Sequence, residues 1–407
     1  MGFVVSLILF LGDLQAILDS SPVVKIPPGE YIGKYTLPST LVDLDGTGVI
    51  IRGIVTDKGG TFKTESIRVA PVKAGAEYLS VSFEGIRVLM DNRPKSWSNW
   101  QNVYKNGEFL EGRGGRLVTP VIGDYPQGGE LYELINSKPL TIKGLTVYTT
   151  DDMPYALQIN GRVNVTLRDC TFKGSNWMTF DLNRCYRGLL SNVTVLCEKN
   201  PNNTTVSEYG ICIHNCQNID VIDCKSTALR HAITLAGDSN PQNIVNRFIT
   251  IRGGTYRSYG VQPYEATQAI HTHGNSEYWR VIGTTSYGGI VGSGDKGEII
   301  DNMIFGRNIG QASIPIYFAE TNGSDFVIRG NAIDSIVVPG KSGAYGSIFV
   351  YLGQHTKRNG ITRIEDNHLR IRGEAAPSIY TWNDSGTTTQ VMMKDNLYGA
   401  QYPPKTQ

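Results

Sequence analysis

Short strands recur along this chain, and each is followed by a turn rich in Gly, Asn or Asp. The repeat is clearest over residues 209–297, where apolar residues spaced by two mark each strand core, as in Ile211 with Ile213 and Ile233 with Leu235. Successive strands begin about 22 to 36 residues apart, a period typical of a solenoid or a propeller. The predicted leading strands are 156–160, 179–183, 210–215, 232–238, 268–275, 289–295, 315–320, 348–353 and 379–384.

The repeat predicts an all-β fold, a right-handed parallel β-helix with a short N-terminal capping helix. The sequence has no W-D signature and no Leu-rich or helical repeat, which disfavours a propeller and the other solenoids. Its 407 residues, with 46 Gly and 21 Tyr, suit an elongated core better than one compact core. No low-complexity linker divides the chain, so we predict one domain over 1–407. Its parts are a cap (1–35) with a helix over 13–20, a projecting insertion (91–137) and regular coils (138–407).

The net charge of +1 gives no reason to expect nucleic acid or an anionic membrane as a partner. Residues 3–11 are apolar but too few to span a bilayer. They lack a basic leader and a small-residue cleavage site, so we expect a first strand or capping segment there and no secretory signal.

All six cysteines fall between residues 170 and 224. Cys170, Cys197 and Cys224 are evenly spaced in similar contexts, and Cys185 and Cys216 share a second context. This pattern predicts buried thiols stacked in successive coils, where they act as small apolar groups. No C-x-x-C pair is present, so we predict no metal site and no cofactor.

Two stretches resemble known proteins. The opening run DLQAILDSSPVVKIPPGEY (13–31) resembles the start of pectate-lyase-like β-helix domains in bacteriophage tail-spike proteins, where the helix caps the first coil. The run LRHAITLAGD, AIHTHGN and GIVGSGDKG (229–297) is similar to one in tail-spike-type proteins that degrade cell-surface polymers, including phage appendage proteins that cleave teichoic acid. The chain departs from that pattern at His271, where Asp is the common residue.

The resemblance implies a homotrimer attached to a phage tail or baseplate. Such a protein belongs to the virion tail and acts outside the bacterium, on a polysaccharide of the bacterial surface. Cellular pectate-lyase-like enzymes are a further relative, but they often bind calcium through clustered Asp on consecutive coils, and this sequence has no such cluster.

Alternation along the leading strands predicts two outward columns on one face. One column contains Asp181, Cys212, Thr234, His271, Gly292, Tyr317 and Tyr351, and the next contains Asn183, His214, Ala236, His273, Gly294, Ala319 and Gly353. Small residues and aromatic rings on a long face suggest a groove for an extended polymer. The predicted substrate-binding residues are Asp181, Tyr317, Glu320, Tyr351, Trp97 and Trp100. Both Trp residues lie in the insertion 91–137, which would serve equally as a carbohydrate-contacting wall or as a packing flap or subunit contact.

The ionisable residues on and beside this face allow three reactions. Hydrolysis of a glycosidic bond needs two carboxyl groups, whereas β-elimination from a uronic acid needs a base, a proton donor and a cation for the sugar carboxylate. Cleavage of a phosphodiester would use the same His and Arg groups to hold phosphate and to move protons. The predicted catalytic residues are His271, His273, Asp238, Asp295, Glu265, Arg230 and His231. An ion pair or turn hydrogen bond would explain Arg230 and His231 equally well, and Asp238 and Asp295 are also ordinary turn formers.

The sequence therefore predicts a tail-spike-like depolymerase that cleaves a capsule, O-antigen or exopolysaccharide, with a glycoside hydrolase favoured over a lyase. A binding-only adhesin and a teichoic-acid phosphodiester hydrolase are the alternatives. An adhesin would offer aromatic platforms and hydrogen-bonding groups without a coupled pair of ionisable residues.

Overall fold

The structure is a computed structural model. It describes residues 13–59, 61–67, 79–82, 88–91, 116–119, 129–135, 138–149, 154–174, 177–196, 209–236, 246–259, 268–272, 276–294, 296–308, 316–318, 326–337, 347–352, 361–373, 379–383, 390–398 and 405–406. The predicted N-terminal segment 3–11 lies outside these residues. In the part of the chain so described, no helix is long and apolar enough to cross a membrane.

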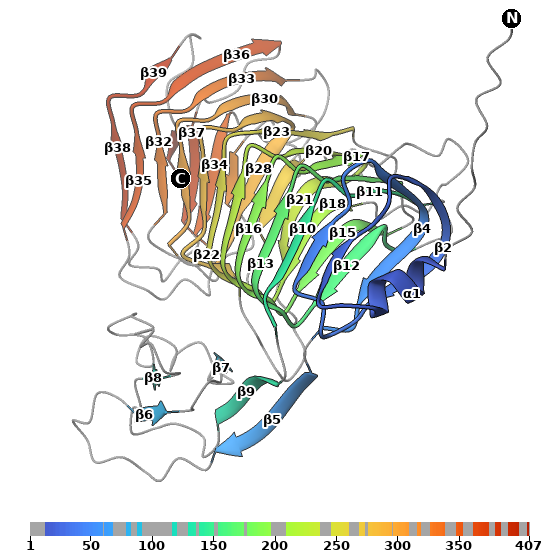
Figure 1. The fold of residues 1–407 in the computed structure, drawn as a ribbon. Coiled ribbons are helices and arrows are strands. Elements are labelled where there is room, and N and C mark those ends of the chain that lie inside the picture. The colour runs from blue at the N-terminus through green and yellow to red at the C-terminus, as the bar shows by residue number, and fades with distance from the viewer. Residues whose placement is uncertain are drawn as a thin grey trace, which may run out of the picture.

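The described strands form two large parallel sheets that wrap the chain into a β-helix (Figure 1). One sheet has 13 described strands and is called face 1. The other has 22 and bends into two faces, face 2 and face 3. The long strand β4 (Val49–Asp57) spans the bend, since it pairs with β11 (Thr146–Tyr148) on face 2 and with β12 (Leu157–Asn160) on face 3. The predicted right-handed parallel β-helix is confirmed.

Each regular coil contributes one strand to each face in turn. Face 1 contains β1 (Val23–Lys25), β3 (Asp43–Asp45), β10 (Leu140–Lys143), β13 (Val163–Arg168), β16 (Tyr186–Ser191), β19 (Gln217–Ile222), β22 (Asn246–Arg252), β25 (Ser276–Glu277), β26 (Arg280–Ile282), β29 (Glu298–Ile300), β32 (Val327–Arg329), β35 (Ile361–Glu365) and β38 (Gln390–Lys394). Face 2 contains β11, β14 (Thr171–Lys173), β17 (Thr194–Leu196), β20 (Lys225–Ala228), β23 (Thr255–Ser258), β27 (Thr285–Tyr287), β30 (Met303–Asn308), β33 (Ala332–Val337), β36 (His368–Gly373) and β39 (Leu397–Tyr398). Face 3 contains β12, β15 (Met178–Asn183), β18 (Tyr209–His214), β21 (His231–Ala236), β24 (Gln268–Thr272), β28 (Gly289–Gly292), β31 (Ile316–Phe318), β34 (Ile348–Leu352), β37 (Ile379–Asn383) and β40 (Lys405–Thr406).

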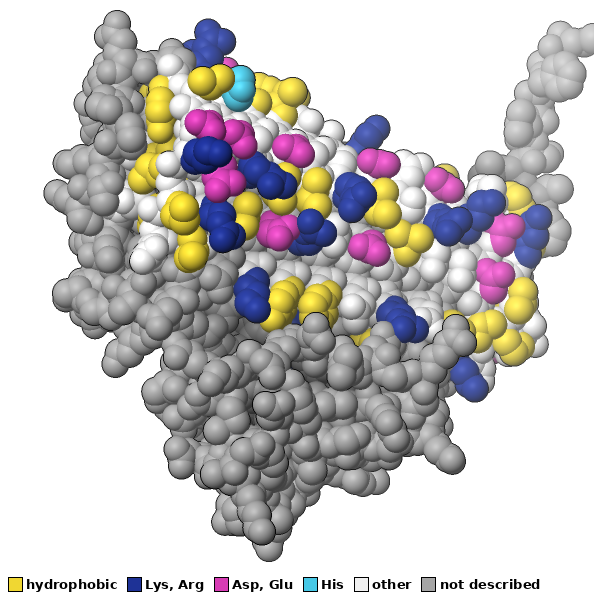
Figure 2. Space-filling model, turned by 90° about the vertical axis from the view of Figure 1, so that its left-hand side faces the viewer, with side chains coloured by type: hydrophobic (Ala, Val, Ile, Leu, Met, Phe, Trp, Pro, Cys, Tyr) yellow, Lys and Arg dark blue, Asp and Glu magenta, His cyan; other side chains and the backbone are white. Residues whose placement is uncertain are grey.

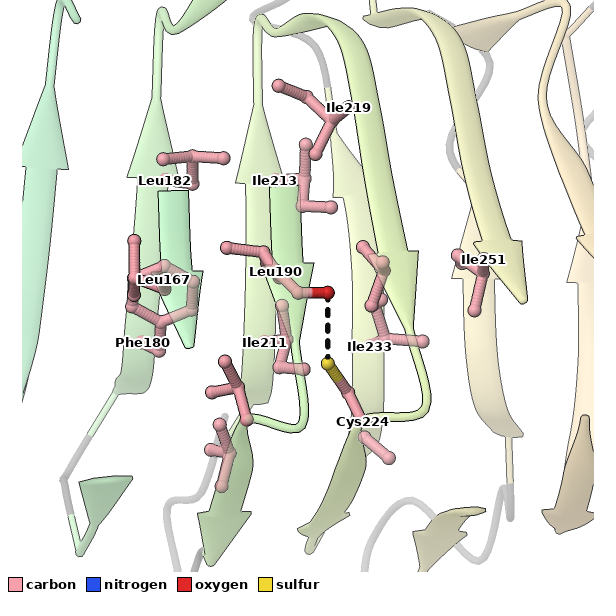
Figure 3. Close-up of a cluster of buried hydrophobic side chains, with 14 of the residues drawn as sticks. Leu167, Phe180, Leu182, Leu190, Ile211, Ile213, Ile219, Cys224, Ile233 and Ile251 are labelled. Carbon is pink, nitrogen blue, oxygen red and sulfur yellow. Dashed lines mark hydrogen bonds between the residues drawn. The ribbon is translucent and has the colours of Figure 1, made fainter. Parts of the chain in front are cut away.

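The core is made of stacked columns of apolar side chains. On face 3, Phe180, Ile211, Ile233 and Ile270 pair in register across successive coils, and each is fully buried. Figure 3 shows this packing, with side chains from the facing strands meeting inside the coils. Burying an apolar side chain of this size contributes about 1.5–3 kcal/mol, so the register of each strand is strongly specified.

The turn from face 1 to face 2 explains why Asp, Asn and Gly recur in the sequence. One residue of this turn adopts the left-handed conformation in coil after coil, with φ between 51° and 67°. Asn, Asp and Gly tolerate this conformation best. The residues concerned are Gly144, Asp169, Asn192, Asp223, Gly253, Gly283, Asp301, Gly330, Asp366 and Asp395. The repeated motifs DN and GN near the C-terminus are these turns.

A ladder of buried asparagines follows these turns in the later coils. Asn331 donates from Nδ2 to the carbonyl of Ile299 in the previous coil (2.9 Å) and to Oδ1 of Asn367 in the next (2.9 Å). Asn302, one coil earlier, donates in the same way to Oδ1 of Asn331 (2.9 Å), and Asn367 to Oδ1 of Asn396 (2.9 Å). Each amide therefore satisfies buried polar groups of its neighbours, as a buried position requires.

The five described cysteines are free and buried. Cys170 and Cys224 stand at the same turn two coils apart, and Val193 occupies that place in the coil between them. Cys197, which the sequence predicts in this stack, lies outside the described residues. Cys185 and Cys216 are stacked as predicted, and the Cys185 amide donates to the Cys216 sulfur (3.3 Å).

The chain leaves the coils after β4. Strand β5 (Thr61–Ile67) and strand β7 (Val88–Asp91) pair antiparallel with β9 (Gly129–Ile135), and β6 (Leu79–Ser82) pairs antiparallel with β8 (Arg116–Thr119). Strands β6 and β7 thus belong to antiparallel pairs and to neither of the large parallel sheets. The insertion 91–137 remains a prediction, since most of it, with Trp97 and Trp100, lies outside the described residues.

The N-terminal cap is held by side-chain contacts with the first coils. Helix α1 (Leu14–Asp19) is capped by Asp13 and buries Leu14 and Leu18, in agreement with the predicted helix. The amide group of Gln15 exchanges two hydrogen bonds with the backbone of Thr36 (2.8 Å each) on β2 (Gly29–Leu37). The cap therefore closes the open end of the first coils.

A buried ion pair joins the two sides of the insertion. Arg162 donates from Nη2 to Asp57 Oδ1 (2.6 Å) and from Nε to Asp57 Oδ2 (2.8 Å), and both side chains are completely inaccessible. Its remaining donors bind the carbonyls of Pro38, Ser39 and Leu41 (2.9–3.0 Å). The pair thus fixes the first coils against the coils that follow residue 138.

We predict that Arg162→Met lowers the free energy of unfolding by about 3–5 kcal/mol, because it leaves the Asp57 carboxylate buried without its partner. The control is Arg52→Met, which removes an exposed pair with Glu30 and should cost far less. Urea unfolding of both variants gives the comparison. Equal losses in the two variants would contradict the prediction.

We also predict that stability falls as pH rises from about 9 to about 11. Burial raises the pKa of the Cys170 thiol, and that of Cys224, from 9.0 to about 11. Below pH 9 the protonated thiols therefore favour the folded state, and this contribution is lost as the pH passes through the folded pKa. Cys224→Val copies Val193 of the neighbouring coil. It should reduce the slope with which the free energy of unfolding falls as the pH rises, measured by urea unfolding at several pH values. An unchanged slope would show that Cys224 is not its source.

Charges of both signs are interspersed on the outer surface (Figure 2). On face 1, for example, Arg280 pairs with Glu298 (2.6 Å), and Arg252 and Arg329 are exposed in the neighbouring column. The described part of face 1 therefore carries charges of both signs.

Candidate functional site

The outward side of face 3 carries many polar residues. The strand register gives one outward column as Gln158, Asp181, Cys212, Thr234, His271 and Val291, and the line of paired backbone positions continues through Tyr317, Phe349 and Tyr380. A second column contains Asn160, Asn183, His214 and Ala236. Asp181 through His271 stand in the first column as the sequence predicts, and Asn183, His214 and Ala236 in the second.

Two assignments in the first column are corrected. Val291, and not Gly292, is the partner of His271, because the register shifts between Gln268 and Ile270. Ile290 and Val291 are adjacent apolar residues, so alternation alone does not show which of them faces the core. In the later coils, Phe349 takes the position expected for Tyr351, which lies two residues further along the same strand.

His214 and Asp181 form the most direct pair of ionisable groups at the site. His214 Nδ1 lies 2.6 Å from Asp181 Oδ1, on the neighbouring coil. The second carboxylate oxygen of Asp181 accepts a hydrogen bond from Gln158 Nε2 (2.9 Å). The Asp181 side chain is 3% exposed and that of His214 is 19% exposed. Asp181 therefore orients His214, and the imidazole is the member of the pair that reaches the surface.

Amide and phenol groups surround this pair. Asn183 donates from Nδ2 to Asn160 Oδ1 (3.2 Å). These two residues pair in the second column, each two residues after Asp181 or Gln158 on the same strand. Tyr155 precedes β12, and its pKa is raised by burial and by the charge of Asp181. These groups are suited to binding sugar hydroxyls, because each can donate or accept a hydrogen bond and each is held at one position along the stack of coils.

Arg230 and Tyr209 stand at the opposite end of the same strands. Arg230 lies immediately before β21 and donates from Nη1 to the Tyr209 hydroxyl (2.6 Å). Its guanidinium carbon is 5.4 Å from the centroid of the Tyr209 ring, within the range of a cation–π contact. The Tyr209 ring in turn lies 5.4 Å from that of His231. Positive charge and aromatic surface are therefore combined at this edge.

Two further histidines are connected in a chain. His231 Nδ1 lies 3.0 Å from the carbonyl oxygen of Gln268, and His231 Nε2 lies 3.1 Å from His271 Nδ1. The two rings are 4.5 Å apart in an edge-to-face arrangement. His231 is 1% exposed and His271 is 5% exposed.

Between the His214 pair and the histidine chain, the centre of the face is formed by small residues. Cys212 and Thr234 follow one another in the first column, and Ala236 stands beside them in the second. Thr234 is 2% exposed, and among the described residues its hydroxyl has no hydrogen-bond partner. A buried hydroxyl in this position could bind a hydroxyl of a ligand, because an unsatisfied buried polar group is costly.

The predicted residues divide into three groups. The structure brings Arg230, His231, His271 and Asp181 together on one face. Tyr317 and Tyr351 lie in β31 and β34 of the same face, further toward the C-terminus. Outside the described residues are His273, Asp238, Asp295, Glu265, Glu320, Trp97 and Trp100.

Three residues at this site were given no role from the sequence: His214, Tyr209 and Tyr155. His214 stood in the predicted second column, but its partner Asp181 is distant in sequence and one coil away, so no local pattern marks the pair. Tyr209 and Tyr155 precede the apolar pairs that define the strands. In the part of the chain that the structure describes, no cluster of three or more His, Cys, Asp or Glu could hold a metal ion.

Comparison with known proteins agrees with this architecture. The family model described as Gp49, pectin lyase-like, matches residues 141–397, and the chain belongs to this family. The search of curated proteins found no match.

Three solved structures share the fold. The tailspike protein gp49 from Pseudomonas phage LKA1 is 17% identical, with 97% of this chain and 71% of that chain covered, at a TM-score of 0.57. The Pseudomonas phage phi297 tailspike gp61 is 15% identical, with 94% of this chain and 67% of that chain covered, at a TM-score of 0.62. The Gp54 tailspike of Acinetobacter baumannii bacteriophage AP22 was solved in complex with A. baumannii capsular saccharide. It is 14% identical, with 97% of this chain and 69% of that chain covered, at a TM-score of 0.60.

Proposed function

We propose that this chain is the polymer-cleaving body of a phage tailspike and that it acts on a polysaccharide of the bacterial surface. The observation that carries the proposal is the array on face 3, where His214 with Asp181, His231 with His271, and Arg230 with Tyr209 stand on adjacent coils. An extended polymer lying along the stack would meet a new set of these groups at each coil, about 4.8 Å apart. The capsular saccharide bound by the AP22 tailspike supports the choice of substrate class.

The described groups favour proton transfer by imidazole. Within the described residues of face 3, Asp181 is the one carboxylate, and both of its oxygens accept hydrogen bonds. A glycosidase needs two carboxyl groups with separate roles. The described groups of face 3 are instead imidazole, phenol, amide and guanidinium groups, which match β-elimination from a uronic acid. In that reaction a cation or amide binds the sugar carboxylate, and a side chain accepts or donates the proton.

Hydrolysis is the second candidate. The sequence favours it through Asp238, Asp295, Glu265 and Glu320, which are close in sequence to the predicted leading strands. A homotrimer, attachment to a phage tail or baseplate, and location in the virion tail belong to the same proposal and follow from the tailspike relationship.

The reaction is tested by incubating the protein with capsular polysaccharides, lipopolysaccharide O-chains and wall teichoic acids. Elimination would produce an unsaturated uronic acid, detected by its ultraviolet absorbance, together with new reducing ends. Reducing ends without that absorbance would indicate a glycosidase and would direct attention to the carboxylates. Released phosphate monoester would indicate teichoic-acid cleavage. Binding of the host's own polymer without cleavage would leave the adhesin as the function.

We predict that His214→Gln lowers kcat by about 10²–10⁴-fold, the range that a proton-transferring side chain contributes. Asp181→Asn should lower it less and should shift the pH–rate profile, because the carboxylate orients the imidazole. The matched control is His368→Gln, which changes an exposed histidine on face 2. Full activity in His214→Gln would remove His214 from the mechanism.

A further inference from the structure

The hydrogen bond between His214 and Asp181 determines where a neutral His214 carries its proton. His214 Nδ1 lies 2.6 Å from Asp181 Oδ1, and an ionised carboxylate can only accept. A carboxyl group is a stronger acid than an imidazolium, so the proton between the two atoms belongs to the ring nitrogen. Neutral His214 is therefore protonated on Nδ1, and its Nε2 carries the lone pair.

The strand register places a small residue beside the ring of His214 on the following coil. Its in-register partner there is Ala236, whereas on the preceding coil it is Asn183. The imidazole is 19% exposed, and Asp181 occupies its Nδ1 side from the preceding coil. A sugar ring lying over Ala236 would therefore meet the imidazole on the side away from Asp181.

Gln158 holds the carboxylate of Asp181 in place. The two residues are in register on adjacent coils, and Gln158 Nε2 donates to Asp181 Oδ2 (2.9 Å). With one oxygen bound to Gln158 and the other to His214, the carboxylate cannot rotate about its Cβ–Cγ bond without losing a hydrogen bond. Three consecutive coils thus contribute one residue each to a line of hydrogen bonds that ends at the imidazole.

The other titratable and charged groups near His214 and Asp181, within the described residues, are Tyr155, Arg184, Cys212 and Cys216. Burial and the charge of Asp181 raise the pKa of Tyr155, so this phenol stays neutral. Both cysteines are buried, and burial raises the pKa of Cys216. Arg184 approaches through its backbone N–H, which donates to the carbonyl of His214 (2.8 Å). Asp181 is therefore the carboxylate set against the imidazole, and Gln158 is the residue that holds it.

We propose that Gln158 is a positioning residue, which acts through Asp181 to keep the proton of neutral His214 on Nδ1 and so makes Nε2 the base of the elimination proposed above. In that step, Nε2 takes the proton from C5 of the uronic acid, and the C–H electron pair becomes the C4=C5 bond. The C4–O bond to the leaving sugar breaks, and the released oxygen takes a proton from water. The imidazolium, whose charge Asp181 offsets, then gives its proton to the hydroxide that remains.

The catalytic step rests on the proposed function, but the line of hydrogen bonds does not need a substrate, so the two are tested separately. Two-bond ¹H–¹⁵N spectra of ¹⁵N-histidine-labelled protein, recorded at about pH 8 to favour neutral imidazoles, distinguish a proton on Nδ1 from one on Nε2. His214→Gln assigns the signal. We expect His214 to carry the proton on Nδ1. A proton on Nε2 of the neutral ring would overturn the proposal.

The role of Gln158 is tested in the same spectra with Gln158→Met, which keeps the length of the side chain and removes the amide donor. The Nδ1 proton signal of His214 should move upfield, because a carboxylate that is held at one oxygen only makes a longer and weaker hydrogen bond to the ring. An unchanged signal in the folded variant would show that Gln158 does not orient Asp181. That result would overturn the proposal whether or not a polymer is cleaved.

In the cleavage assay, we expect Gln158→Met to lower kcat about tenfold with KM little changed, since partners that orient a histidine are worth about 10–100-fold at metal sites. The matched control is Gln390→Met, which changes an exposed glutamine on face 1 and should keep full activity. Urea unfolding checks that both variants are folded. An unchanged kcat in Gln158→Met would sink the proposal. If the unaltered protein cleaves no polymer, the proposed function fails, and the labelled spectra still decide the tautomer of His214 and the role of Gln158.

Discussion

The turn between face 1 and face 2 is the constraint on which the rest of the structure depends. One residue of each turn adopts a left-handed conformation, and the next is a buried cysteine in two of the earlier coils, at Cys170 and Cys224, and an asparagine from Asn302 to Asn396. The asparagine amides bind the carbonyls of one coil and the side chain of the next. Because strand alternation has a period of two, a slip of one residue would turn every side chain to the wrong face. The repeated turn prevents that slip.

This fixed register is also what assembles the candidate site. Asp181, His214, His231 and His271 come from four strands that lie far apart in the sequence, and stacking brings them to adjacent coils on face 3. Their surroundings then differ in kind. His214 pairs with a carboxylate, whereas His271 contacts His231, whose Nδ1 lies beside a backbone carbonyl. Two imidazoles of the same chemistry thereby have different partners.

Stability and function draw on separate parts of the coil. The inward columns and the Arg162–Asp57 pair are almost fully buried and hold the coils together on both sides of the insertion. The outward residues of face 3 are not part of that apolar core, so packing of the core does not dictate their identity. This separation explains how polar groups can occupy the outward columns while the apolar columns beside them stay continuous.

The sequence alone determined the β-helix, the capping helix and most of the outward columns, because these depend on local periodicity and turn chemistry, which each coil repeats. It failed at Val291, where two adjacent apolar residues leave alternation undecided, and at Tyr351, whose predicted position in the column is taken by Phe349. Only the tertiary structure decided the contacts of His214 with Asp181 and of His231 with His271. Those contacts join residues more than thirty positions apart, and no local pattern specifies which coil lies beside which.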